Sequence, residues 1–160
     1  GGQFMENRNN LHDYGLVLIL FGILNLFVFA STVVAGLVDG SIKGALATVE
    51  PDILVAVKVV LGIIGAIMAL IIFADVLLGI KALKVSKNPN KDKGYITVAK
   101  VFFVLSILST VFSVVSLING KADTVDNILS LANAALSVIV YFSFIKHAQA
   151  VRTDVINGVE

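Results

Sequence analysis

Three ionisable residues interrupt otherwise apolar stretches of the chain: Lys58, Asp75 and Lys100. Charges inside such stretches are candidates for function because each is costly to place in hydrocarbon. Their depth argues for a milder role. At 1.5 Å per helical residue, each lies roughly 12–14 Å from the centre of its apolar stretch, near the edge of a ~30 Å hydrocarbon layer. At that depth, lysine can extend to water and a carboxylate can meet lipid headgroups.

A sharper alternative is that Asp75 and Lys100 pair with each other. They share a depth on two helices that follow one another along the chain and would run antiparallel. We predict an interhelical ion pair there, structural rather than catalytic, while the solvated alternative stays open.

Little in the sequence points to catalysis or to a bound cofactor. The chain has no cysteine, and its two histidines, His12 and His147, lie near opposite ends. Paired carboxylates, a Ser-His-Asp set, a glycine-rich phosphate loop and an HExxH motif are all missing from the sequence. The net charge of +1 argues against a nucleic-acid partner. We therefore expect no enzyme activity, no cofactor and no metal.

The elements that carry these residues are four apolar runs, each long enough to cross hydrocarbon as a helix. Hydrophobic residues make up 58% of the chain and charged residues 14%, too few charges for a water-facing surface of ordinary composition. A helix satisfies its own backbone in lipid. We predict an all-α integral membrane protein whose four transmembrane helices form a compact antiparallel up-down bundle. The expected spans are residues 14–38, 53–80, 95–118 and 125–145.

The remaining residues are expected to form tails and turns around one transmembrane domain, residues 13–150. Residues 1–4 resemble a cloning remnant before Met5, and the stretch to residue 12 is a short N-terminal tail. Residues 151–160 form a short C-terminal tail. Pro51 suits the first position of a helix, and the Asn-Gly pair in residues 119–123 indicates a turn.

Lysine and arginine predict the orientation in the membrane. The loop between the second and third spans is rich in lysine, and counting the tails, nine cations fall on its side against three on the other. Both termini should therefore lie in the cytoplasm of a multi-pass cell-membrane protein. The composition is typical of a bacterial source. The lysines also allow contact with anionic lipid, although setting topology explains them as well; they are Lys81, Lys84, Lys87, Lys91 and Lys93.

Each run also carries a face of small or weakly polar residues at three-to-four spacing. Small residues let helix backbones approach, and hydroxyl or amide groups form hydrogen bonds between helices. We predict that these faces point into the bundle; a narrow polar path is the alternative. The small residues are Gly15, Gly22, Gly36, Gly62, Gly65 and Ala69. The polar ones are Asn25, Asn133, Ser106, Ser109, Ser113, Ser130 and Ser137.

Two functions remain. The first is a small non-enzymatic polytopic membrane protein that acts by association, as a scaffold or as an accessory or regulatory subunit. Its partners would be the lipid bilayer and another membrane protein or a second copy of itself. The second is a small transporter or channel that forms its pathway by oligomerisation. No core contains a midplane acid or an internal proline, features expected of ion-coupled transporters.

Overall fold

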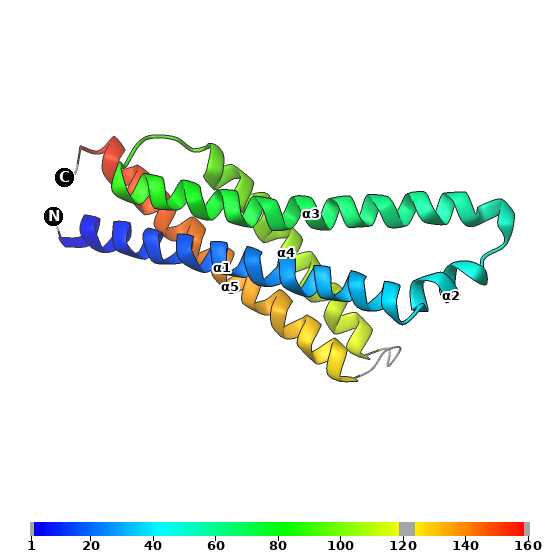
Figure 1. Ribbon diagram of the computed structural model, residues 1–160. Helices are drawn as coiled ribbons and strands as arrows, with labels where there is room; N and C mark the ends of the chain where they lie inside the picture. Colours follow the sequence, from blue (N-terminus) through cyan, green and yellow to red (C-terminus); the bar gives the residue numbers. More distant parts are fainter. Residues whose placement is uncertain (1, 119–123, 159–160) are drawn as a thin grey trace. The chain divides into compact units, whose positions relative to one another are not determined.

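The computed structural model describes residues 2–118 and 124–158, and within these ranges the chain is helical and contains no strand (Figure 1). The helices are α1 (Gly2–Val38), α2 (Ser41–Ala47), α3 (Pro51–Lys87), α4 (Gly94–Ile118) and α5 (Thr124–Ile156). The all-α prediction is confirmed. The turn expected at residues 119–123 lies outside the described residues.

Four of these helices, α1, α3, α4 and α5, are long and apolar enough to cross a membrane by length and composition. The prediction of four such helices is confirmed. Helices α1 and α3 each contain 37 residues. At 1.5 Å per residue they are about 55 Å long, well beyond the ~30 Å that hydrocarbon requires.

The long helices extend past the expected apolar spans, mainly at their polar ends. Helix α1 begins at Gly2 instead of near residue 14, α3 continues to Lys87 instead of residue 80, and α5 continues to Ile156 instead of residue 145. Residues 2–12 and 151–156, expected as tails, are therefore helical. The physical reason is that one face of each polar end remains apolar and is buried, as Leu11 and Val151 are.

Helix α2 was not expected, since residues 39–50 read as a polar connection. Gly40 precedes it with a φ of +74°, a left-handed conformation that a residue without Cβ adopts freely. The Asp39 carboxylate accepts a hydrogen bond from the Ser41 backbone N–H at 2.8 Å. This local geometry closes the chain into a short helix that the polar composition did not reveal.

The chain divides into two compact units, each described by itself. The first, named the terminal unit, comprises Gly1–Leu18 and Leu78–Glu160. The second, named the hairpin unit, comprises Ile19–Leu77. The terminal unit thus contains α4 and α5 with the outer ends of α1 and α3, and the hairpin unit contains α2 with the rest of α1 and α3.

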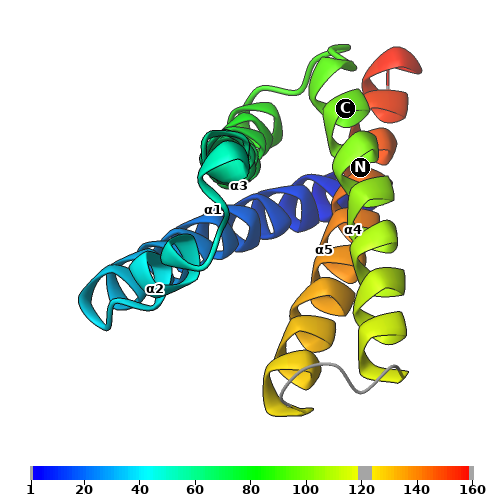
Figure 2. The same cartoon turned by 90° about the vertical axis from the view of Figure 1, so that its right-hand side faces the viewer.

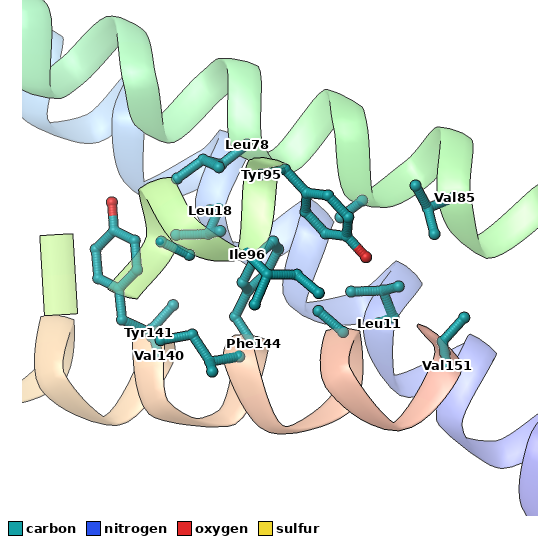
Figure 3. Packing of buried hydrophobic residues seen from close by; sticks show 14 of the residues in the cluster. Leu11, Leu18, Leu78, Val85, Tyr95, Ile96, Val140, Tyr141, Phe144 and Val151 are labelled. Carbon is teal, nitrogen blue, oxygen red and sulfur yellow. The ribbon is translucent and has the colours of Figure 1, made fainter. Parts of the chain in front are cut away.

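The terminal unit has a hydrophobic core to which all four of its helical segments contribute (Figure 3). Helices α4 and α5 lie side by side and run in opposite directions (Figure 2). Aromatic pairs join them: Phe102 stacks on Tyr141 with ring centroids 6.0 Å apart, and Tyr95 meets Phe144 edge-on at 6.1 Å. The fully buried side chains are Phe144, Leu11, Leu18, Val85 and Val151.

Long apolar side chains elsewhere stay exposed within the described structure. In the hairpin unit, Phe27 is 69% exposed and Val38 is 83% exposed. In the terminal unit, Phe112 on α4 is 71% exposed. Each unit therefore presents an extensive exposed hydrophobic surface, which is unfavourable in contact with water.

Candidate functional site

Two of the glycines predicted to pack lie where α1 meets α3. In the terminal unit, a Cβ built on Gly15 would lie 2.9 Å from Ala82 Cβ and 3.0 Å from the Gly79 carbonyl oxygen. In the hairpin unit, a Cβ on Gly22 would lie 2.9 Å from Val76 Cγ2. Both glycines are buried. Their missing side chains allow the two backbones to approach closely, as expected of packed membrane helices.

The other predicted small residues are used differently. Gly36 lies against Ile42 of α2, 2.8 Å from where its Cβ would be. Gly62 and Gly65 on α3 have no heavy atom of the described residues within 4 Å of a built Cβ, and Ala69 is exposed. Half of the predicted set therefore packs within its own unit, and the α3 face of Gly62, Gly65 and Ala69, named the small face, does not.

A hydrogen bond between helices joins two of the predicted polar residues. Ser113 on α4 and Ser130 on α5 have their hydroxyl oxygens 3.3 Å apart. Ser106 instead donates to the Phe102 carbonyl at 2.8 Å, and Ser137 donates to the Asn133 carbonyl at 2.9 Å, each within its own helix. Asn25 is half-buried, whereas the remaining two residues are exposed: Ser109 and Asn133.

The interrupting charges are in contrasting environments. Asp75 is 2% exposed within the hairpin unit, while Lys58 on the same helix is exposed. Lys100 belongs to the terminal unit and is exposed. Burial singles out Asp75 among the three, and its pairing with Lys100 stays a prediction.

The predicted lysine-rich loop is held in place by cations of the terminal unit. Arg8 on α1 donates from Nε to the Ser86 carbonyl at 2.7 Å and from an Nη to the Lys87 carbonyl at 3.1 Å. These carbonyls end α3 and have no partner within the helix. Arg152 on α5 donates from Nε to the Lys91 carbonyl at 3.1 Å.

Asp92 fixes both sides of this loop. Its carboxylate lies 2.8 Å from Lys81 Nζ and accepts the Gly94 backbone N–H at 2.9 Å, where α4 begins. The Lys81 hydrogen bond, followed by the Gly94 one, holds the pKa of Asp92 below its ordinary value of 3.8. The loop therefore joins α3 to α4 in a defined conformation. Of the predicted lysines, Lys81 is half-buried, and the others are exposed: Lys84, Lys87, Lys91 and Lys93.

Two polar pockets open on the terminal unit. The smaller has a volume of about 280 Å³ and is lined by residues of α1 and α3, including Arg8, His12 and Lys87. The larger has a volume of about 390 Å³ and lies between the start of α4 and the end of α5. This larger pocket is named the basic pocket. It is lined by Lys93, Ile96, Thr97, Lys100, Gln149, Arg152 and Thr153.

The sequence predicts a pair with Asp75 for Lys100 and only a topology-setting charge for Arg152, and it does not single out Thr97 or Gln149. A signal was present: Lys93, Thr97 and Lys100 follow helical three-to-four spacing. The residues that α5 contributes to the basic pocket are not predicted, because they lie beyond the expected span, which ends at residue 145.

Tyr14 and His147 stack with ring centroids 5.6 Å apart. Within residues 2–118 and 124–158, no group of three or more His, Asp or Glu side chains could hold a metal ion.

No protein-family model matches the sequence, and no curated protein and no solved structure matches it either. The geometry of the terminal unit and of the small face is thus the basis for a functional proposal.

Proposed function

We propose that this chain is a multi-pass membrane protein without enzyme activity that acts by associating with other membrane helices. Its four long helices would cross the cell membrane as an antiparallel up-down bundle with both termini in the cytoplasm. A scaffold or an accessory or regulatory subunit is the class of protein that fits.

One contrast carries the proposal: the polar ends of the helices bury an apolar core, while their apolar stretches expose large side chains. Leu11 and Val151 are fully buried at the polar ends, whereas Phe112 is 71% exposed. In water, the hydrophobic effect drives such a core together. In hydrocarbon, greasy faces gain nothing by meeting each other. The contrast supports a water-exposed helical head joined to stretches that lipid covers.

The small face supports association. Gly15 and Gly22 are already covered by α3 within their units. Gly62 and Gly65 occupy the middle of the α3 apolar stretch, and a Cβ built on either one would meet no described atom beyond the adjoining turns of α3 within 4 Å. A face of this kind permits close approach of another helix, which in lipid is stabilised by van der Waals packing. The partner would be a second copy of this chain or another membrane protein.

A photo-crosslinking experiment tests the proposal. A benzoylphenylalanine placed at Gly65 is expected to give an adduct of increased mass in membranes, either at twice the chain's mass or with a second membrane protein. The same group at Ile67 is the matched control, because Ile67 projects from the opposite side of α3 and is 50% exposed. Unchanged mass at Gly65, or equal adducts at both positions, would contradict association through this face.

The transport alternative makes a different demand, since water would have to reach Asn25 and Asn133. Neither residue lines the two polar pockets of the terminal unit. Solute flux in liposomes that is abolished by Asn25→Leu would replace the association proposal with this one.

A further inference from the structure

The basic pocket combines a defined volume with an unbalanced charge. Its volume of about 390 Å³ lies within the range of small-ligand sites, roughly 300–1,000 Å³. Three of its lining side chains are cationic: Lys93 and Lys100 on the α4 side, and Arg152 on the α5 side. The rest are neutral, so the lining contains no carboxylate.

The nearest acids in the sequence are engaged with other groups. Asp92, next to Lys93, lies 2.8 Å from Lys81 Nζ. Asp154, two residues after Arg152, accepts a hydrogen bond from Asn7 Nδ2 at 3.3 Å. The three cations thus line one pocket with no acid in it to offset their charge, and a bound anion would be attracted to all three.

The arginine is held in position. Its Nε–H donates to the Lys91 carbonyl at 3.1 Å, which uses one of the five N–H donors of a guanidinium. The fixed fork suits the oxygens of a phosphate, and the two lysines add point charges. The amide of Gln149 and the hydroxyl of Thr153, also in the lining, add neutral donors.

We propose that the basic pocket binds a phosphate group, either that of an anionic phospholipid or free inorganic phosphate. The assignment of the phosphate to a lipid rests on the proposed membrane insertion. The affinity of the pocket for a phosphate group does not depend on it. Lys100 directly precedes the apolar stretch 101–118 and so would lie near the edge of the hydrocarbon, at headgroup level. Cationic pockets between helices on the cytoplasmic side are known to hold anionic headgroups. Lipid phosphate is therefore the expected occupant.

The test measures binding to the purified chain in detergent by thermophoresis. The probes are short-chain phosphatidylglycerol, the matching phosphatidylcholine and inorganic phosphate. Phosphatidylglycerol should bind, and Arg152→Gln or Lys100→Gln should weaken it about tenfold, because bonds to charged groups are the strong ones. Lys84→Gln is the control: it removes the same charge from an exposed position outside the pocket and should change the affinity less than about twofold.

The outcomes separate the sources. Binding of phosphatidylglycerol without phosphate assigns the site to lipid, and competition by phosphate assigns it to the free anion. Arg152 also bonds to the loop between α3 and α4, so Arg152→Gln could unfold the chain. In that case Lys100→Gln, which makes no such bond, still tests the pocket. Equal binding of both lipids, or an equal loss in Lys84→Gln, would overturn the inference. Carbonate extraction of the same membranes reports insertion separately, so a chain that is inserted but binds no anion refutes the pocket and leaves the proposed function standing.

Discussion

Gly15 of α1 faces Ala82 of α3 so closely that a Cβ on the glycine would lie 2.9 Å from Ala82 Cβ. The Gly79 carbonyl oxygen would be 3.0 Å away on the same side. Neither neighbour is the far end of a flexible side chain, so neither can give way without moving a helix. The contact therefore fixes how near α1 and α3 come within the terminal unit.

Replacing this glycine should destabilise the terminal unit. We expect Gly15→Leu to lower the free energy of unfolding by about 1–3 kcal/mol, because the added atoms overpack the contact. The cost of overpacking outweighs the gain in helix propensity, up to ~1 kcal/mol, that comes from replacing a glycine within a helix. The measurement is thermal or denaturant unfolding in detergent.

Gly62→Leu provides the matched control, since no described atom lies within 4 Å of a Cβ built there. It should leave stability unchanged or slightly raised. Equal losses in the two variants would show that the close approach at Gly15 is not what stabilises the α1–α3 contact.

The Asp92 carboxylate should make stability depend on pH in the acidic range. Its pKa in the folded chain lies below the ordinary 3.8, first because of the Lys81 hydrogen bond and then because of the Gly94 N–H. A lowered folded pKa stabilises the fold above pH 4, and the contribution is lost as pH falls through the folded pKa. Asp92→Asn should therefore be less stable than the parent at pH 6, with the difference closing toward pH 3.

Salt serves as the control for this prediction. The carboxylate is exposed, so its interaction with Lys81 should be small and should weaken further in 1 M salt, where the screening length is about 3 Å. The backbone bond to Gly94 should survive. A stability gap that is independent of pH would rule out titration of Asp92 as its source.

Much of the fold follows from the sequence because hydrocarbon allows few alternatives. A run such as 101–118, with no charge and no proline, can cross lipid only as a helix. The helices extend past the expected spans because apolar composition marks only the part of a helix that suits hydrocarbon. Phe4, Leu11 and Leu18 recur every seven residues, a spacing that places them on one face of a continuing helix, and all three are buried.

The candidate site was harder to predict because it depends on which helices meet and at what register. Lys93, directly before α4, and Lys100 within α4 share a face by helical spacing alone, but only the packed α4–α5 pair brings Arg152 beside them. The serines show the same limit. Ser113 meets Ser130 across the helices, while Ser106 bonds to a carbonyl one turn back in its own helix, a partner that is in reach at any register.

The orientation prediction can be tested with single cysteines, because the chain contains none. Ala45 in α2 and Asn88 after α3 are both exposed and lie in the first and second connections between long helices. A membrane-impermeant maleimide should label Ala45→Cys in intact cells and Asn88→Cys only after the cells are opened. The excess of lysine and arginine beside Asn88 is the physical reason. The opposite labelling pattern would invert the proposed topology, and labelling of both in intact cells would contradict it.

The contrast between the two phenylalanines predicts where packing stabilises the chain. Phe144 is 0% exposed and Phe112 is 71% exposed, although α5 and α4 are both long apolar helices. Phe144→Ala should cost about 3–5 kcal/mol of unfolding free energy, because the buried ring leaves a cavity in the terminal-unit core. Phe112→Ala should cost under about 1 kcal/mol, as expected for a side chain away from any core. Comparable losses for the two variants in detergent would mean that the exposed stretch is packed, and the division between a water-exposed head and lipid-covered helices would then fail.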